Sequence, residues 1–258
     1  MSLYPEEKAN SFSRVCPQDC FCTNTPKRQT FCYNMEYMPI GLNPHTTGLL
    51  ISDSSFTTIQ NNAFKGVPYL VEMNITDNQI TTIYPGAFNF LEMLEKLDLS
   101  NNKLTTFPRE AIAEVESYTV RGVIWRCPST TVLTAEQFRE CVEIEELDIS
   151  ENNIIDIEPG AFSTLSKLRV LYLRDNKLTK IRESVLEGLT NLEVLDVSGN
   201  QITSLPTNIK TLLPKLKYIV GYDNPWSCDC NLAVNWDLLA HFFHEKPAVC
   251  SSPPELAG

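Results

Sequence analysis

The segment Leu94-Glu-Lys-Leu-Asp-Leu-Ser-Asn-Asn-Lys-Leu104 decides the fold of this chain. Its apolar residues and one asparagine follow the order LxxLxLxxNxL, which recurs at 70–80, 144–154, 168–178 and 192–202. The asparagines of this pattern are spaced by 24, 50, 24, 24 and 24 residues: Asn78, Asn102, Asn152, Asn176, Asn200 and Asn224. A fixed period of this length indicates stacked structural repeats, with one degenerate repeat inside the double interval.

This pattern is that of a leucine-rich repeat. Its LxL segment predicts a short strand with leucines pointing inward and the residues between them pointing outward. The asparagine amide is expected to pair with buried backbone groups of adjacent turns. A larger apolar residue should fill the other side of each repeat, at Phe64, Phe88, Phe162 and Leu186. We therefore predict an α/β leucine-rich repeat solenoid of horseshoe form, with a parallel sheet on its concave face, short helical or irregular convex segments and disulfide-bonded caps.

The domain organisation follows from the same period. We expect a flexible N-terminus at 1–15, an N-terminal cysteine cap at 16–45, eight repeats at 46–223 and a C-terminal cysteine cap at 224–258. The first repeat has Ser54 in place of the asparagine. A solenoid leaves its core open at both ends, which is why each end needs a cap.

The fourth repeat is irregular. Pro128 occupies the asparagine position, and proline has no backbone N–H to donate. Cys127 and Cys141 lie in the same repeat. A disulfide between them would close a loop of about 15 residues and contribute roughly 3 kcal/mol. We interpret the pair as a local staple; the alternative is a loop near 125–132 that protrudes to bind a ligand.

Composition excludes several classes of protein. A net charge of -11 argues against nucleic-acid binding, and no apolar run is long enough to span a membrane. The first residues lack a secretory leader's apolar core, so we expect a mature fragment whose leader has been removed. No catalytic motif is present, and His241 and His244 do not form the HExxH of a zinc protease. We therefore predict no enzyme activity, no cofactor and no metal.

Nine cysteines indicate an oxidising compartment. Those of the first cluster, Cys16, Cys20, Cys22 and Cys32, allow three disulfide pairings, and their short spacings leave zinc as the rival interpretation. The last cluster follows the motif Asn224-Pro-Trp-Ser-Cys228-Asp-Cys230.

Residues 16–258 resemble extracellular leucine-rich repeat proteins with paired cysteine caps, a group that includes toll-like receptor ectodomains and neuronal adhesion proteins. The repeat length and short array look most like a variable lymphocyte receptor or an invertebrate relative of it. This resemblance implies the disulfides Cys16–Cys22, Cys20–Cys32 and Cys228–Cys250, and a secreted or cell-surface location. It leaves Cys230 without its partner, because the fourth cysteine of such a cap is missing. We therefore expect the chain to end inside the cap.

The outward residues of the strands are the candidate ligand-binding site. Asp98, Asp148 and Asp196 share one column of the predicted sheet. Toward the C-terminal end, tyrosines and valines form a patch, and tyrosine is a favoured contact residue at protein interfaces. The predicted ligand-binding residues are Asp98, Asp148, Val170, Tyr172, Arg174, Val194, Asp196, Tyr218, Val220 and Tyr222.

The sequence Asn74-Ile-Thr76 is an N-glycosylation signal on a predicted strand of the concave face. A glycan there would direct ligand binding toward the C-terminal repeats. From the resemblance we expect an immune recognition receptor that binds a protein or glycan antigen on a microbial or cell surface. The alternative is an adhesion or guidance protein that binds a host protein.

Overall fold

The computed structural model describes residues 16–23, 27–113, 122–126, 130–139, 141–227 and 250–252. These residues fall into two compact units. The first unit contains the described residues up to Leu104 and 110–113, and the second contains Thr105–Arg109 and the described residues from 122 onward. The predicted flexible terminus and the residues Cys127, Pro128, Cys228 and Cys230 lie outside the described part of the chain.

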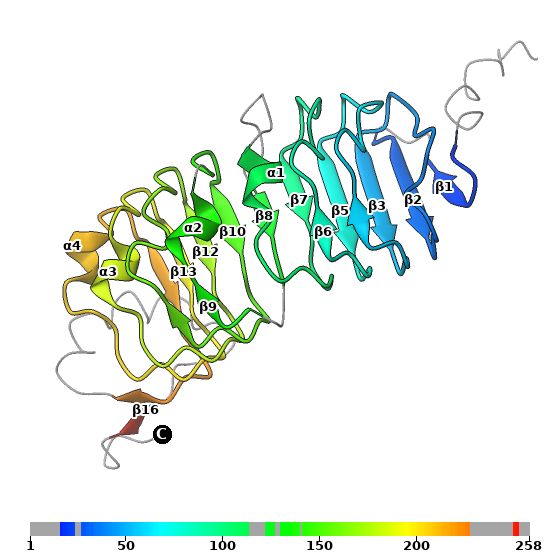
Figure 1. Cartoon of the computed structure of the whole chain (residues 1–258). Coiled ribbons are helices and arrows are strands. Elements are labelled where there is room, and N and C mark those ends of the chain that lie inside the picture. Colours follow the sequence, from blue (N-terminus) through cyan, green and yellow to red (C-terminus); the bar gives the residue numbers. More distant parts are fainter. Residues whose placement is uncertain are drawn as a thin grey trace, which may run out of the picture. The chain divides into compact units, whose positions relative to one another are not determined.

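The sheet of the first unit is built from one strand per repeat. The antiparallel pair of the cap is followed by parallel strands in chain order: β1 (Cys20–Cys22), β2 (Gln29–Tyr33), β3 (Gly48–Ser52), β5 (Glu72–Thr76) and β7 (Lys96–Asp98) (Figure 1). Met73 and Ile75 alternate with outward residues and are fully buried. The period-2 alternation therefore places the leucine positions in the core, as predicted.

The second unit repeats this arrangement. Its sheet runs parallel in chain order through β8 (Gly122–Ile124), β10 (Glu146–Asp148), β12 (Val170–Tyr172), β13 (Val194–Asp196) and β14 (Tyr218–Val220). The central residues Leu147, Leu171 and Leu195 are fully buried. The open face of each sheet is the face whose side chains point away from this core.

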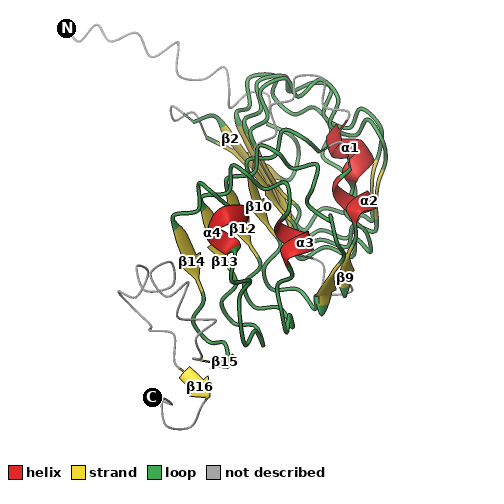
Figure 2. Cartoon of the chain, turned by 90° about the vertical axis from the view of Figure 1, so that its left-hand side faces the viewer, coloured by secondary structure: helices red, strands yellow, loops and turns green. Residues whose placement is uncertain are grey.

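The other side of the repeats holds shorter elements. Two small parallel pairs form there: β4 (Thr58–Ile59) with β6 (Thr82–Ile83), and β9 (Val132–Leu133) with β11 (Asp156–Ile157). The helices in the described part of the chain have at most five residues: α1 (Arg109–Ala113), α2 (Ala135–Phe138), α3 (Glu183–Leu186) and α4 (Ile209–Leu212). Figure 2 shows α2 and α3 on the side away from β12 and β13. The predicted leucine-rich repeat solenoid, with a parallel sheet and short helical back, is confirmed.

The N-terminal cap is stapled by two disulfides, Cys16–Cys22 and Cys20–Cys32, the pairs that the resemblance implies. Cys20–Cys32 joins β1 to β2, and Cys16–Cys22 ties the segment before β1 to the end of that strand. Thr30 and Cys32 of β2 are fully buried and lie beside Leu49 and Ile51 of β3. The cap therefore extends the inward row of the sheet and covers the first repeat.

At the other end, β15 (Trp226–Ser227) pairs with β16 (Cys250–Ser252), and Trp226 lies opposite Cys250. Trp226 is fully buried, and its indole N–H donates to the carbonyl oxygen of Gly221 at 2.6 Å. This pairing brings the backbone of Cys250 near the start of the NPWxCxC motif. The disulfide Cys228–Cys250 stays a prediction.

Aromatic residues fill the interior away from the sheet. The rings of Phe64 and Phe88 stack with centroids 6.0 Å apart in the first unit. In the second unit Phe138 lies between Phe107, at 4.8 Å, and Phe162, at 5.5 Å. The prediction for Phe64, Phe88, Phe162 and Leu186 is confirmed, because at most 1% of each side chain is exposed.

The asparagines form the expected ladder. The Asn176 amide donates to the carbonyl oxygens of Ile149, Leu173 and Arg174 at 3.0–3.3 Å. Its carbonyl oxygen accepts the N–H of Ile154 at 3.0 Å. Asn200 and Asn224 repeat this pattern one and two turns later. Each buried amide therefore ties its own strand end to the preceding repeat.

Candidate functional site

The register of the second sheet brings most of the predicted ligand-binding residues together. One row across the strands places Val170, Val194 and Tyr218 side by side. The next row places Tyr172, Asp196 and Val220 side by side. Neighbouring strands lie about 4.8 Å apart, so side chains in one row are in contact distance. With Tyr222 two residues beyond Val220, they form the tyrosine patch: Val170, Tyr172, Val194, Tyr218, Val220 and Tyr222.

The tyrosine patch is partly open to solvent. Tyr218 is 37% exposed and the other members are half-buried. The pKa of the Tyr172 hydroxyl is raised, mainly by burial and further by the carboxylates of Glu146, Asp148 and Asp196. The phenol therefore stays neutral at physiological pH and keeps a proton to donate. The patch offers apolar area with polar tips, a combination favoured at protein interfaces.

The three aspartates that share one column of the sheets have a structural role that was not predicted. In Asp98, Asp148 and Asp196 the Oδ1 atom accepts the backbone N–H of the serine two residues on, at 2.9 Å in each case. Such side-chain bonds close the turn after a strand. The repeated order Asp-x-Ser in the sequence is the signal that could have indicated this role.

The expectation that Asp196 is free to face a ligand needs correction. Only 8% of this residue is exposed, and Oδ1 also accepts the hydroxyl of Ser198 at 2.6 Å. Burial raises the pKa of Asp196, while the bonds from Ser198 oppose the rise. Asp148 is half-buried, and its Oδ2 atom faces the guanidinium of Arg126 at 3.4 Å, while Asp98 belongs to the first unit. Of the three, Asp148 is therefore the carboxylate best placed to meet a ligand.

Charged groups border the tyrosine patch at the strand ends. Arg126 lies 3.4 Å from Asp148 and 3.6 Å from Glu151. Arg174, a predicted site residue, lies 2.7 Å from Asp175 and 3.9 Å from Glu151. The side chains of Glu151, Arg174 and Asp175 are the more exposed ones, so pairs among them contribute little stability and leave charges available to a partner. Arg126 and Asp148 are partly buried. Arg126 and Glu151 were not among the predicted site residues, although their spacing from Arg174 and Asp175 places them at equivalent repeat positions.

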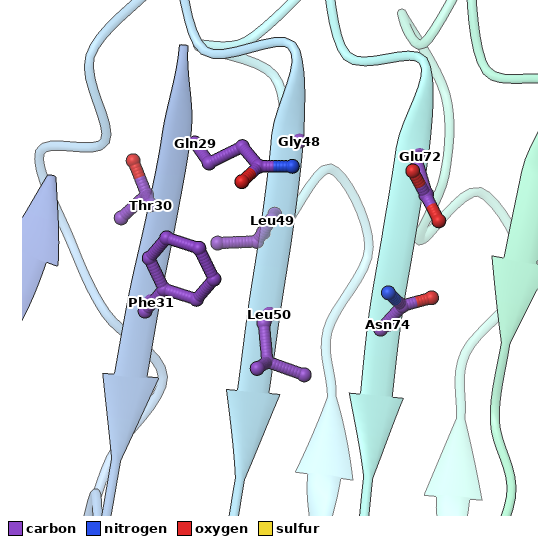
Figure 3. Close-up of a pocket in the computed structure, with 8 residues that line it drawn as sticks. All are labelled: Gln29, Thr30, Phe31, Gly48, Leu49, Leu50, Glu72 and Asn74. Carbon is purple, nitrogen blue, oxygen red and sulfur yellow. The ribbon is translucent and has the colours of Figure 1, made fainter. Parts of the chain in front are cut away.

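The open face of the first unit has a different composition. Phe21, Phe31, Leu50 and Asn74 follow one another across β1, β2, β3 and β5 in one row. Beside them, Gly48 takes part in lining a depression of about 90 Å³ (Figure 3). Its lining includes Gln29, Phe31, Leu50, Glu72 and Asn74. The predicted ligand-binding residues include none from the cap or the first repeat, and this depression was not predicted.

Two other kinds of site have no support within the described residues. No group of three or more histidine, cysteine or acidic side chains is arranged to hold a metal ion. No helix in that part of the chain has the length and apolar character needed to cross a bilayer.

The fold and the open sheet faces define a class of protein: a repeat scaffold that presents extended surfaces for binding. A family model described as leucine rich repeat matches residues 44–112, 124–178 and 166–220, and the chain belongs to that family. No curated protein sequence matches significantly.

Solved structures share the fold. Human 5T4, also titled Wnt-activated inhibitory factor 1 or trophoblast glycoprotein, is similar with a TM-score of 0.77 and 21% identity over 94% of both chains. A chain from an octameric complex of latrophilin 3, Unc5D and the leucine-rich repeats of FLRT2 is similar with a TM-score of 0.63 and 24% identity, over 89% of this chain and 78% of that one. At these identities the likeness establishes the fold.

Proposed function

We propose that this chain is an extracellular adhesion or signalling protein that binds another protein through the tyrosine patch. The observation that carries the proposal is the register that sets Val170, Val194 and Tyr218 beside Tyr172 and Val220 on one open sheet face. A patch of aromatic and aliphatic side chains with a charged border is the usual anatomy of a protein-binding surface.

The chemistry of the border suggests the kind of partner. Arg126 and Arg174 alternate with Asp148, Glu151 and Asp175 along the strand ends. Such a mixed-sign border suits a partner that carries both signs of charge, and it would set orientation more than affinity. The tyrosines would supply most of the binding energy, because large side chains in a desolvated centre are the usual hot spots.

Two further observations support an extracellular location and a host protein as partner. The disulfide-bonded cap fits the oxidising conditions outside the cell. One structurally similar chain comes from a complex that, by its title, contains FLRT2, latrophilin 3 and Unc5D. The sequence led us to expect an immune receptor for microbial antigen, similar to variable lymphocyte receptors. That function is now the alternative, and the binding test below distinguishes it from the proposal.

The test is a binding screen of the tetramerised full chain against ectodomains of host cell-surface proteins, with microbial glycans and whole bacteria in parallel. We expect a specific host protein. The double variant Tyr218→Ala with Tyr222→Ala should weaken that binding by roughly 30-fold or more, as for the loss of about 2 kcal/mol at a hot spot.

A matched control is available in the first unit. Tyr69 and Tyr84 are 49% and 44% exposed and lie outside the sheets. Tyr69→Ala with Tyr84→Ala removes the same chemical groups and should leave binding unchanged. Binding to microbial glycans alone, lost in the Tyr218 and Tyr222 variant, would replace this function with antigen recognition. Host-protein binding that survives that variant would refute the assignment of the patch.

A further inference from the structure

We infer that Asn74 carries an N-linked glycan whose first sugar lies in the depression beside Gly48. The inference rests on the proposed function to the extent that N-glycosylation requires passage through the secretory pathway. It goes further, because it assigns an occupant to the open face of the first unit.

The side chain of Asn74 is available for attachment. It is half-buried on the open face of β5 and lines the depression (Figure 3). Within the described residues its amide makes no hydrogen bond, whereas the amides of Asn78 and Asn102 each donate to backbone carbonyl oxygens. Thr76, the third residue of the signal, is also half-buried on β5. Asn74 thus differs from the ladder asparagines, whose amides are already engaged.

The depression begins directly next to the attachment point. Asn74 pairs in register with Leu50, and Leu50 with Phe31, while Glu72 pairs with Gly48 and Gly48 with Gln29. A sugar on Asn74 that turns toward β3 therefore meets Leu50 first and Phe31 next. The three atoms nearest to a Cβ built at Gly48 all belong to the Gln29 side chain, with Cγ at 3.1 Å, so this side chain lies over Gly48 beside the depression.

The lining suits a pyranose ring. Phe31 and Leu50 offer apolar surface for the C–H groups of the sugar, and sites for small ligands combine such surface with a few polar groups. Gln29 can donate and accept hydrogen bonds, and the Glu72 carboxylate can accept them from hydroxyl groups. The side chains of Gln29 and Glu72 make no hydrogen bond or ion pair with other described residues. Four different groups around one attachment point thus favour a carbohydrate over an apolar occupant alone.

Attachment needs a lipid-linked oligosaccharide as co-reactant. The amide nitrogen of Asn74 forms a bond to C1 of the first sugar, and the bond between C1 and the pyrophosphate oxygen breaks. The amide loses one proton, and the lipid pyrophosphate leaves with the electron pair of the broken bond. No oxidation or reduction occurs.

The glycan would shield the open face of the first unit. Phe31 and Leu50 would be covered by carbohydrate, which explains two outward apolar residues on this sheet. The tyrosine patch of the second unit would remain available to a protein partner.

Attachment is tested on the full chain expressed behind a secretory leader in cells that make only high-mannose glycans. Release of the glycan by an amidase in H₂¹⁸O converts the modified asparagine to ¹⁸O-labelled aspartate, and peptide mass spectrometry locates it. We expect the label at Asn74 and none in Thr76→Val, which removes the signal. A folded, secreted chain that carries no glycan at Asn74 overturns the inference while the proposed function stands.

Placement is tested by thermal unfolding. We expect the chain with a glycan trimmed to one sugar on Asn74 to have a Tm about 2–4 °C higher than the Thr76→Val variant. This is the scale of one modest contact in a chain of this size. Gly48→Val fills the depression with a residue that strands favour. We expect it to abolish the rise in the glycosylated protein while the non-glycosylated protein still folds.

The matched control moves the same signal out of the depression. Gln79→Asn, in the Thr76→Val background, creates a second Asn-Ile-Thr triplet that ends at Thr81, and both Gln79 and Thr81 are exposed. A single sugar there should give a Tm that Gly48→Val does not change. The placement in the depression is refuted if the sugar on Asn74 does not raise Tm. It is also refuted if the sugar raises Tm equally with and without Gly48→Val.

Discussion

The Nδ2 atom of Asn152 donates to the main-chain carbonyl oxygen of Trp125 at 3.2 Å. Trp125 follows β8, the strand of the irregular fourth repeat, and Asn152 lies in the turn after β10, the next strand. Asn152 also donates to the carbonyl oxygens of Ile149 and Ser150. The fourth repeat lacks its own asparagine, yet it supplies the carbonyl that the following asparagine needs. The irregular repeat therefore provides the first backbone acceptor for the asparagine ladder of the second unit.

The ladder predicts a large effect for a single amide. Asn176→Ala removes one acceptor and three donor contacts and leaves buried backbone groups without a partner. We expect the free energy of unfolding to fall by roughly 3 kcal/mol, since each unsatisfied buried group costs about 1–3 kcal/mol. Urea denaturation checks this value. Gln201→Ala, at an exposed position, should change stability by less than about 0.5 kcal/mol. If the two variants lower the free energy of unfolding equally, the asparagine ladder does not contribute to stability.

A second prediction concerns the turn after each strand. The residue there has a positive φ in successive repeats, as in Asp175 (φ 53°) and Gly199 (φ 63°). A Cβ at Gly199 would collide with the carboxylate of Asp175 and lie 3.2 Å from its backbone nitrogen. We expect Gly199→Ala to destabilise the chain by about 1–3 kcal/mol. Gly66→Ala is the control, because a Cβ there has open space and no positive φ is required. Thermal unfolding that ranks Gly66→Ala as the worse variant would contradict this account.

Asp196 gives a prediction about pH. Its pKa is raised by burial, so the folded state holds the proton more tightly than the unfolded state. This group therefore lowers stability as pH rises from below its unfolded pKa through its folded pKa. Asp196→Asn keeps the oxygen that accepts from Ser198 at 2.9 and 2.6 Å but removes the buried charge. We expect Tm to rise by about 1–3 °C at pH 7 and to be unchanged at pH 3. A lower Tm at pH 7 would mean that the charge itself is used, for example by Arg174.

Much of the fold could be predicted because the sequence pattern within each repeat specifies the local structure of that repeat. The LxL alternation decides which side chains enter the core, and the 24-residue period decides which strands are neighbours. Leu171 and Leu195 are adjacent for both reasons. The rows of the tyrosine patch follow from the same alternation and the same 24-residue period.

The parts that could not be predicted depend on contacts beyond this alternation. Outward position suggested that Asp196 is exposed, but the Asp-x-Ser turn draws it inward. The depression near Asn74 depends on Gly48 and on where the Gln29 side chain lies, neither of which the repeat pattern specifies. The repeat pattern therefore predicts which side chains lie on the open face of a sheet. The local hydrogen bonds of the polar side chains decide which of those side chains a ligand can reach.

The pair Cys127 and Cys141 is the last prediction. Cys141 is buried, with 3% exposed, and follows the core residue Phe138, whose ring contacts Phe107 and Phe162. A disulfide to Cys127 would close a loop of about 15 residues and contribute roughly 3 kcal/mol. We expect peptide mapping under non-reducing conditions to find this linkage. Cys127→Ser should then lower the free energy of unfolding by about that amount, and the reductant-treated wild-type chain should match the variant in protection of the Phe138 amide from hydrogen exchange. The double variant Cys127→Ser with Cys141→Ala should be no less stable than Cys127→Ser alone. If both cysteines are alkylated in the native, unreduced protein, the staple does not exist and the loop near 125–132 becomes the candidate for ligand binding.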